Sequence, residues 1–483
     1  MRDSAQDERN TMKLLPITIL MLCAAASPIV YGQESSASYD QSATAESLGL
    51  EPYAIPSDFF PVFPWDHLGD WGEKYQPLKD GVQSMADCAC TLSGFVDTEE
   101  SVELAKSVGL RCIYESKFER FDDRQVSPEE LPGKLAAIDA AIKERVESTK
   151  NDPYVLGYNL TDEPGAYHFK SLAAAVAAVK KYAPGKLAYV NLFPGYASTI
   201  GADVDSQLGT YSYEEYLERF VHAVKPQLLS YDNYMIEYSE DMRDPARASV
   251  FFSDLFPVRR VALKYDLPFW FIGSSLCIMK DSSPPSPTRY AMQTYIPLAA
   301  GAQGLTWFLY YPLGWSGSPI DANGAKTLSW QYMRDVNIQA QALGMILKNY
   351  RSTELGLTPL YSASEAPNLP QFPTPPTNVL ANLSARFSTN GPFAESEKPR
   401  ILVGEFEALD GASVAALVVN LDFESSVKIT FEKPSGYGAL KTISPLDGSA
   451  TEASAEQIES GFWLLPGHGT LFILERGATS PER

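Results

Sequence analysis

Strand-like and helix-like segments alternate along most of this chain of 483 residues, and this alternation restricts its fold more than any other feature. Short runs rich in aromatic and β-branched residues are typical of buried strands. Eight such runs occur at residues 60–66, 87–95, 111–115, 154–163, 186–193, 227–234, 268–275 and 304–311. Segments with apolar residues at helical spacing lie between or after them, at residues 99–108, 127–148, 171–182, 213–224, 248–264, 289–300 and 330–348. Eight strands with crossover helices over roughly 290 residues predict an α/β fold of the (β/α)8 type, the TIM barrel.

A doubly wound open sheet is the rival arrangement, because it is built from the same βαβ units. Its nucleotide-binding forms carry a Gly-rich fingerprint after the first strand, and no such fingerprint follows residue 66. Beyond about residue 352, Pro- and Asn-rich sequence leads into short, partly alternating runs at residues 400–407, 413–420, 427–431 and 470–474. We expect a small C-terminal antiparallel β-sandwich there, with its last two strands joined in a hairpin by a turn that contains His468.

The N-terminal residues have the features of an export signal. Met12 and Lys13 precede an apolar run that ends at Ala26, and small residues before Gln33 suit a cleavage site, so the residues before Met12 read as an over-extended start. We expect a signal peptide over 1–32, a flexible leader over 33–54, the barrel over 55–351, a Pro/Asn-rich linker with the first sandwich elements over 352–396, and the sandwich over 397–483. The mature protein would be secreted or periplasmic without a membrane span, and an uncleaved anchor is the alternative.

Charge and cysteine content exclude some functions. The formal net charge of -21 is spread along the chain, which argues against binding nucleic acid through a general positive field. Four cysteines follow the signal, and either a disulfide among them or free buried thiols fits their placement: Cys88, Cys90, Cys112 and Cys277. Neither these cysteines nor the four scattered histidines have metal-ligand spacing, so we expect no metal and no cofactor.

The fourth predicted strand ends in two adjacent carboxylates, Asp162 and Glu163, and Pro164 and Gly165 stop the strand just after them. In a (β/α)8 barrel the C-terminal ends of the strands form the catalytic face. The two acids are therefore the first candidates for catalysis, and the like charge of Asp162 would favour a protonated Glu163. The alternative is a helix N-terminus, with Asp162 as the cap and Glu163 in the first turn.

Acidic and aromatic residues dominate the ends of the other predicted strands. Carboxylates and amides hydrogen-bond to sugar hydroxyls and aromatic rings stack on the apolar faces of sugars, so such a lining suits a carbohydrate. For any single aromatic residue, ordinary barrel packing is the alternative. The candidate binding residues are Trp65, Asp66, Glu115, Asn191, Tyr231, Tyr234, Trp307 and Tyr310, and Asp232 is a further candidate for catalysis.

Three motifs resemble the (β/α)8 glycoside hydrolases of families 42 and 123. They are Asp-Glu-Pro at residues 162–164, Tyr-Asp at residues 231–232 and the run from Ala299 to Phe308. Those families often carry a β-sandwich beside the barrel, and the resemblance covers about residues 55–350. It implies a glycoside hydrolase with Glu163 as the general acid/base.

The seventh predicted strand departs from this pattern. In the main retaining clan a glutamate nucleophile ends that strand, whereas residues 268–277 contain no carboxylate. Two mechanisms remain open. As in families resembling 20 and 123, Asp162 would orient a 2-acetamido group that attacks the anomeric carbon, with Tyr231 or Tyr234 holding the acetamido oxygen. Alternatively, Asp232 is the second carboxylate of an ordinary pair.

The missing glutamate also leaves open a non-enzymatic alternative, a carbohydrate-binding barrel that has lost its chemistry. An esterase is disfavoured, because Ser274 and Ser275 lack a Gly-x-Ser-x-Gly elbow and an evident histidine partner. The four scattered histidines do not assemble the Tyr/His constellation of a polysaccharide lyase.

Overall fold

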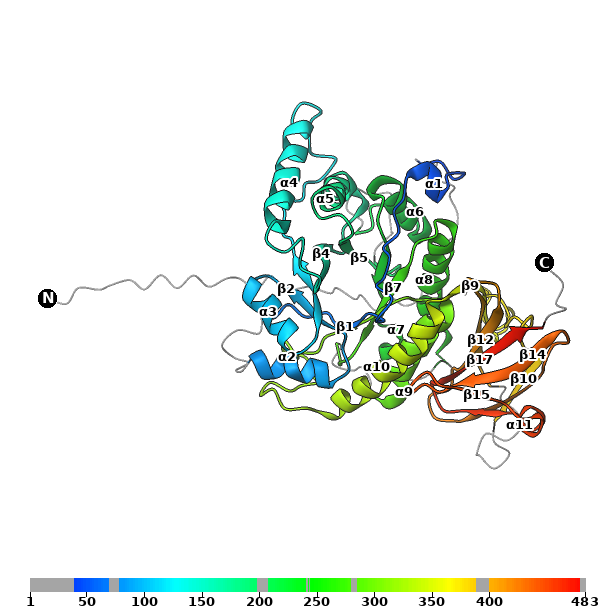
Figure 1. The fold of residues 1–483 in the computed structure, drawn as a ribbon. Coiled ribbons are helices and arrows are strands. Elements are labelled where there is room, and N and C mark those ends of the chain that lie inside the picture. The colour runs from blue at the N-terminus through cyan, green and yellow to red at the C-terminus, as the bar shows by residue number, and fades with distance from the viewer. Residues whose placement is uncertain are drawn as a thin grey trace. The chain divides into compact units, whose positions relative to one another are not determined.

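The computed structural model describes residues 39–68, 78–197, 207–239, 242, 244–278, 285–387 and 399–477. Eight parallel strands form one sheet in the order β1-β8-β7-β6-β5-β4-β3-β2, with helices outside it (Figure 1). The predicted barrel is therefore confirmed. Its strands are β1 (Val62–Pro64), β2 (Leu92–Val96), β3 (Arg111–Glu115), β4 (Val155–Asp162), β5 (Leu187–Leu192), β6 (Leu229–Asp232), β7 (Phe269–Ser274) and β8 (Leu305–Phe308).

The barrel closes between β1 and β2 just beyond the end of β1. His67 and Phe95 form a parallel bridge, and the Phe95 N–H donates to the Asp66 carbonyl at 2.8 Å. Gly94 makes this approach possible, because it has a φ of +91° and a Cβ there would lie 2.6 Å from the Asp66 carbonyl oxygen. A side chain at this position would collide with the backbone of the neighbouring strand.

Each predicted helix of the barrel overlaps an observed one, and α6 has the predicted ends. Ser212 caps α6 by accepting the Glu215 N–H, and apolar residues three or four apart face the sheet. The helix α2 was not predicted; it ends at Asp87, where we expected the second strand to begin. The helices are α2 (Leu78–Asp87), α3 (Glu99–Ser107), α4 (Leu131–Val146), α5 (Phe169–Tyr182), α6 (Tyr213–Val224), α7 (Met235–Tyr238), α8 (Pro245–Lys264), α9 (Pro287–Ala300) and α10 (Leu328–Leu347).

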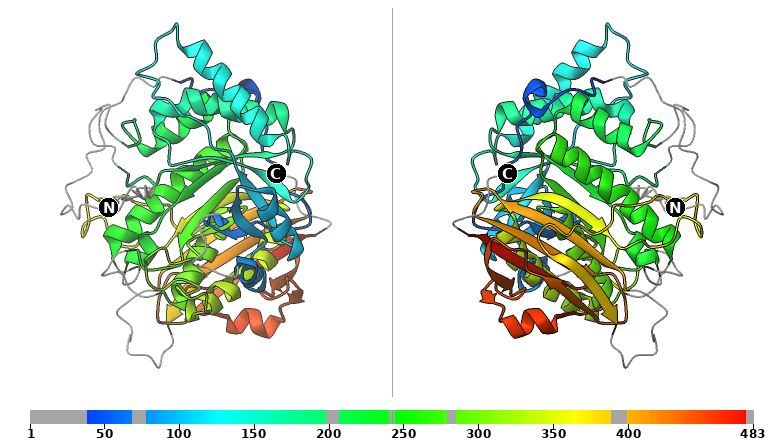
Figure 2. Two further views of the ribbon diagram at one scale, coloured as in Figure 1. Left: turned by 90° about the vertical axis from the view of Figure 1, so that its left-hand side faces the viewer. Right: turned by 90° about the vertical axis from the view of Figure 1, so that its right-hand side faces the viewer.

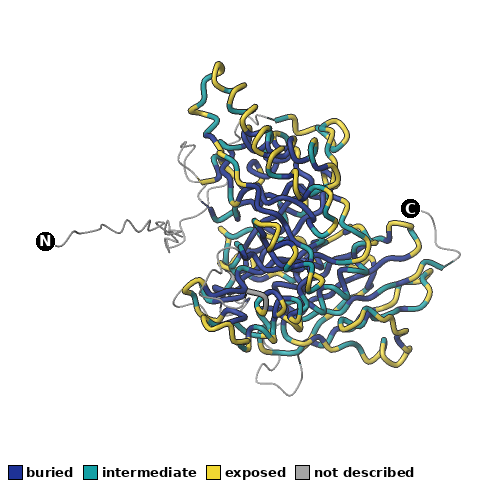
Figure 3. The backbone as a smooth tube through the Cα atoms, turned by 60° about the vertical axis from the view of Figure 1, so that its left-hand side comes forward, coloured by how far each residue is buried: buried dark blue, intermediate teal, exposed yellow. Residues whose placement is uncertain are grey.

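Alternate residues of each strand face two separate hydrophobic regions, since successive side chains on a strand point to opposite faces. The larger region lies between the strands and the helices. The smaller one fills the barrel and includes Phe63, Trp65, Phe95, Tyr189 and Trp270. Some of these rings meet edge to face, as between Trp65 and Phe95 at 4.6 Å, and others are tilted, as between Tyr189 and Trp270 at 5.7 Å. Figure 3 shows this buried interior beneath the exposed outer turns of the helices.

The C-terminal part is an antiparallel β-sandwich, as predicted. One sheet has the strand order β15-β14-β17-β12-β11-β9 and the other β10-β13-β16, and α9 packs against β11 and β12 (Figure 2). Gly404 on β11 permits this contact, because a Cβ there would lie 1.8 Å from the Ala299 carbonyl oxygen. The strands are β9 (Tyr350–Leu357), β10 (Ala381–Phe387), β11 (Ile401–Ala408), β12 (Ser413–Asn420), β13 (Val427–Glu432), β14 (Tyr437–Ile443), β15 (Ala450–Glu452), β16 (Phe462–Leu464) and β17 (Gly469–Arg476).

The predicted C-terminal hairpin is wrong. The strands on either side of the turn, β16 and β17, belong to different sheets: β16 pairs with β13, whereas β17 pairs with β12 and β14. His468 lies in the turn as expected, and its Nδ1 is 2.8 Å from the Pro466 carbonyl. The turn therefore carries the chain from one sheet to the other.

The predicted signal peptide lies outside the described residues, as do residues 33–38. From residue 39 the predicted leader packs on the barrel instead of extending freely. It contains α1 (Ala45–Leu48), and the backbone N–H of buried Tyr53 donates to the Gln227 carbonyl at 2.8 Å. Cys88, Cys90, Cys112 and Cys277 are all free thiols, so the disulfide alternative does not hold in this structure.

Candidate active site

Asp162 is the last residue of β4, and Glu163 turns the chain sharply away from the strand. The backbone of Glu163 has a φ of +43°, the left-handed region that residues other than glycine rarely adopt. Its N–H donates to the Asn191 carbonyl on β5 at 2.9 Å. Unfavourable backbone geometry of this kind is concentrated at functional sites, where surrounding contacts hold it in place.

Asn191 joins the acids of β4 and β6. Its Nδ2 donates to Oδ1 of Asp162 and to Oδ1 of Asp232, both at 3.0 Å. Its Oδ1 accepts the Ser230 hydroxyl at 3.2 Å, and Ser230 also bonds to the Tyr189 hydroxyl at 2.8 Å. Tyr189, Asn191, Ser230 and Asp232 therefore form a buried polar layer above the aromatic filling of the barrel.

Glu163 and Asp232 are in direct contact through a hydrogen bond between their carboxyl groups. One of the two must carry a proton, since two carboxylates cannot donate to each other. Burial, followed by the charges of Asp232 and Asp162, raises the pKa of Glu163 well above its usual range. Burial and the Asp162 charge raise the pKa of Asp232 as well. The pair therefore retains one proton at neutral pH.

Asp162 is the solvent-accessible acid of the site. The surrounding protein still desolvates it enough to raise its pKa, while Asn191, His67 and Arg120 favour its charged form. It is thus an accessible carboxyl that lies next to the protonated pair.

Three other predicted lining residues gather around β1 and β3. Oε1 of Glu115 accepts the Asn159 amide at 3.1 Å and is 2.5 Å from Nδ1 of His67. Asp66 is buried, and its Oδ2 accepts the backbone N–H of Tyr310 at 2.6 Å. Trp65 is also buried, against Phe95 inside the barrel.

Tyr234 lies close to the acids, as predicted. The charges of Asp232, Glu163 and Asp162 contribute to raising its pKa, although burial is the larger cause. Tyr196, which was not predicted, bonds to the Tyr234 backbone and is also close to Asp232. Two phenol groups therefore lie near Asp232.

Asp254 on α8 supports the site from behind. Its Oδ2 accepts the Gly195 N–H at 3.0 Å and the Asn233 Nδ2 at 2.7 Å. Gly195 follows β5 and Asn233 follows Asp232, so one buried carboxyl fixes both segments. Burial raises the pKa of Asp254 to about 8, which leaves it largely protonated at neutral pH.

Three predicted binding residues do not face the acids. Tyr231, Trp307 and Tyr310 are buried in the layer between the strands and the helices. The Trp307 indole donates to Asn337 at 2.8 Å, and the Tyr310 hydroxyl accepts the Trp330 indole at 2.8 Å. Because side chains alternate along a strand, the inward direction of Asp232 sends Tyr231 outward.

Sequence reasoning missed several residues that build the site. His67 directly follows Asp66, so its position at a strand end was available as a signal. Glu237 on α7 brings a further buried carboxyl to the segment after β7, where its Oε1 accepts the Ile278 N–H at 2.9 Å. Asp254 could not be found from strand ends, because it lies within a helix.

No protein-family model matches this sequence, and no curated protein matches it. The structure is similar to Gan42B, a GH42 β-galactosidase, at a TM-score of 0.56 and 8% identity, over 89% of this chain and 100% of that one. A catalytic mutant of Gan42B from G. stearothermophilus gives a TM-score of 0.54 at 8% identity, over 88% and 100% of the two chains. At this identity the likeness establishes the shared barrel fold.

A β-galactosidase from the psychrophilic Marinomonas ef1 is less similar, at a TM-score of 0.42 and 10% identity, and the match covers 60% of each chain. The chain thus spans less than two thirds of that enzyme. Within the described ranges, no group of three or more His, Cys, Asp or Glu side chains is arranged to hold a metal ion. No helix in the described part of the chain is both long and apolar enough to cross a membrane.

Proposed function

We propose that this protein is a glycoside hydrolase in which Glu163 is the general acid. The observation that carries the proposal is the hydrogen-bonded pair of Glu163, which follows β4, and Asp232, which ends β6. A glycosidase needs one carboxyl that stays protonated at its working pH, and burial beside like charges is how such a proton is retained. The barrel fold that the chain shares with a GH42 β-galactosidase supports a carbohydrate as the substrate.

In the first step Glu163 gives its proton to the glycosidic oxygen, the bond from that oxygen to the anomeric carbon breaks, and the oxygen of a 2-acetamido group on the substrate bonds to the anomeric carbon. In the second step a water molecule attacks the anomeric carbon, the bond to the acetamido oxygen breaks, and the water gives a proton to the Glu163 carboxylate. Before reaction Asp232 accepts the hydrogen bond that the protonated Glu163 donates, and the phenols of Tyr196 and Tyr234 lie near Asp232. Asn191 keeps Asp162 and Asp232 at a fixed distance from each other.

Asp162 fits the role of second group better than Asp232. The carboxyls of a retaining pair lie about 5 to 5.5 Å apart, and those of an inverting pair about 6.5 to 9.5 Å apart. Carboxyls that share a hydrogen bond are closer than either distance, so Glu163 and Asp232 leave no room between them for an anomeric carbon. Asp162 is accessible to a substrate, which favours the mechanism in which it orients a 2-acetamido group.

The Glu163→Gln variant tests the general acid. General acid catalysis contributes roughly 10²- to 10⁴-fold in rate, so hydrolysis of a natural glycan should fall by about that factor. An aryl glycoside with a good leaving group departs without protonation and should be largely spared. Wild type is first screened on neutral and 2-acetamido aryl glycosides and on natural glycans, and turnover of the hydrolysed ones is then measured.

Glu119→Gln is the matched control, because Glu119 is an exposed carboxylate in the segment after β3. Its turnover should equal that of wild type. If Glu163→Gln turns over the natural glycan at a rate within about threefold of wild type, Glu163 is not the general acid.

A carbohydrate-binding barrel without catalysis is the second candidate, favoured by the absence of a carboxylate from residues 268–277. It predicts binding of the same glycans by wild type with no turnover of any of them. The same screen therefore separates the two functions.

A further inference from the structure

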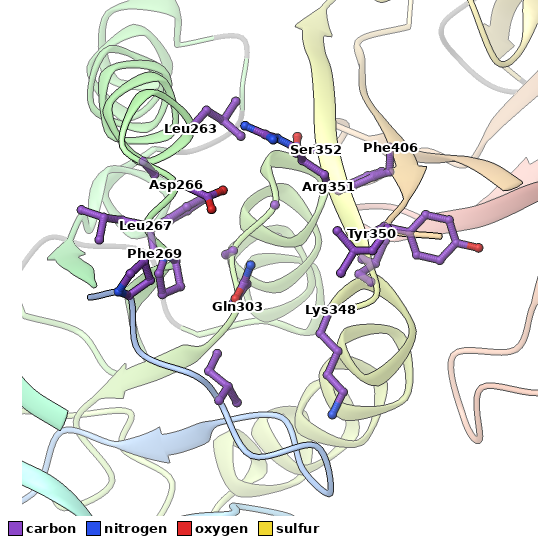
Figure 4. Close-up of a pocket in the computed structure, with 18 of the residues that line it drawn as sticks. Leu263, Asp266, Leu267, Phe269, Gln303, Lys348, Tyr350, Arg351, Ser352 and Phe406 are labelled. Carbon is purple, nitrogen blue, oxygen red and sulfur yellow. The ribbon is translucent and has the colours of Figure 1, made fainter. Parts of the chain in front are cut away.

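A cavity of about 460 Å³ lies at the end of the barrel opposite the acids. The segment before β1, the C-terminal part of α8, the start of β7 and strand β9 form its walls. Its volume is within the range of small-molecule sites, which is about 300 to 1,000 Å³. Figure 4 shows the side chains of Asp266 and Gln303 directed into the space between α8 and β9.

Several polar groups of this cavity have few partners or none in the described structure. The guanidinium of Arg259 is half-buried, and its only hydrogen bonds to described residues go to the Ser352 hydroxyl, at 3.2 and 3.0 Å. No side-chain hydrogen bond or ion pair to a described residue is formed by Asp266, Gln303 or Arg351. Arg259 and Asp266 line the same cavity without pairing with each other.

Charge and chemistry define the ligand that these groups fit. Arg259 and Lys348 line the cavity with the single acid Asp266, and Arg351 lies on β9 beside it, so a ligand with negative charge is favoured. Guanidinium groups bind carboxylates through paired hydrogen bonds. Asp266 accepts hydrogen bonds from hydroxyl groups, and the Gln303 amide can both donate and accept. Apolar walls, including Ile55, Leu267 and Phe406, can cover the carbon skeleton of the ligand.

We propose that this cavity binds a small polyhydroxy carboxylate, such as a sugar acid, with its carboxylate on Arg259 and its hydroxyls on Asp266 and Gln303. The site is separate from the catalytic acids and does not depend on the proposed activity. Burial lowers the pKa of Arg259 to about 10, and the nearby charge of Glu354 acts in the opposite direction.

Isothermal titration of the full chain with D-glucuronate, D-glucose and acetate tests the proposal. Glucose lacks the carboxylate and acetate lacks the hydroxyls. We expect glucuronate to bind with a Kd on the order of 1 mM or lower. Glucose and acetate should each bind at least about tenfold more weakly, because each loses one set of hydrogen bonds.

The variant Arg259→Gln should weaken glucuronate binding by about tenfold or more, since it removes a charge-assisted hydrogen bond. Gln303→Ala should weaken it by about threefold or more, since it removes the amide that bonds to a hydroxyl of the ligand. Arg260→Gln is the matched control. Arg260 is the next residue on α8 and is exposed, and it pairs with Glu214 at 2.8 Å outside the cavity. Its affinity for glucuronate should be that of wild type.

Gln303 is only partly buried and forms no side-chain hydrogen bond to a described residue, so Gln303→Ala keeps the test valid even if Arg259→Gln fails to fold, which thermal unfolding would reveal. The proposal is overturned by the absence of glucuronate binding, by equal affinity for glucose or acetate, or by binding that neither substitution weakens. The last result would also be obtained if glucuronate bound only among the catalytic acids.

Discussion

At the scale of single residues, the site depends on a proton shared by two carboxyls from neighbouring regions of the barrel. Glu163 reaches Asp232 because its backbone turns into the left-handed region at the end of β4. Asn191 holds Asp232 from the other side at 3.0 Å. The charge of Asp232 thus contributes to the raised pKa of Glu163, and a substitution that removes this charge should lower that pKa.

Asp232→Asn should move the alkaline limit of activity to lower pH. Removing the Asp232 charge removes one cause of the raised Glu163 pKa, so Glu163 loses its proton at lower pH and activity on a natural glycan falls earlier as pH rises. The measurement is kcat/KM against pH for wild type and variant. Activity at acidic pH should persist in the variant.

A different result would identify Asp232 as the nucleophile. In that case Asp232→Asn would abolish turnover at every pH, including that of activated aryl glycosides. An unchanged pH profile would show that the two carboxyls are not coupled in solution.

The residue types of this site could be predicted from sequence, but their pairing could not. Acids at strand ends are visible as soon as the strands are recognised, which is why Asp162, Glu163 and Asp232 were selected. The contact between Glu163 and Asp232 follows from a backbone angle and a strand register, which the sequence does not state. Strand alternation, applied strictly, would have separated inward Asp232 from outward Tyr231.

At the scale of elements, the barrel strands were predictable because both their faces are buried, so each strand reads as a continuous apolar run. Strands of the sandwich with exposed faces gave no such signal. All residues of β10 are exposed or only partly buried, and β9, β10, β14, β15 and β16 were not predicted as strands. A turn such as the one at His468 shows where the chain reverses but not which strand the next one pairs with.

The closure of the barrel at Gly94 is open to test. We expect Gly94→Ala to lower the free energy of unfolding by roughly 2 kcal/mol or more. The alanine would have to adopt a φ of +91°, and its Cβ would lie 2.6 Å from the Asp66 carbonyl oxygen. Urea unfolding measured by circular dichroism gives this difference.

Gly109→Ala is the control for backbone conformation alone, since Gly109 has a φ of +80° and open space around its Cβ position. Its loss should be about 1 kcal/mol. Equal losses in the two variants would mean that β1 and β2 do not approach as closely as the structure has them.

At the scale of the whole molecule, export remains a proposal that rests on residues 12–32. Expression with the full N-terminus in a host with a general secretion system should give a mature protein that begins near Gln33. Mass spectrometry of the N-terminal peptide measures this. Exported protein that retains the run after Lys13 would identify an uncleaved anchor instead.

The stability of the whole molecule should depend on pH through its buried acids. Burial raises the pKa of Asp254 from 3.8 to about 8 in the folded protein. Between these two values the unfolded chain has released the proton while the folded protein keeps it. The free energy of unfolding therefore contains a contribution that is fully present below about pH 4 and is lost as pH rises through about 8.

Asp254→Asn should flatten this dependence, because an amide does not titrate. An amide oxygen in the place of Oδ2 can accept both the Gly195 N–H and the Asn233 Nδ2, so the variant should be about as stable as wild type at pH 5 and more stable than wild type as pH approaches 9. The measurement is Tm from pH 5 to pH 9. The change in Tm over this range should differ between wild type and the variant by an amount on the order of a few degrees. Asp335→Asn, at an exposed position of α10, should keep the wild-type slope. Parallel curves for wild type and Asp254→Asn would show that Asp254 is already ionised near pH 5 in the folded protein, and that its burial is offset by the two hydrogen bonds it accepts.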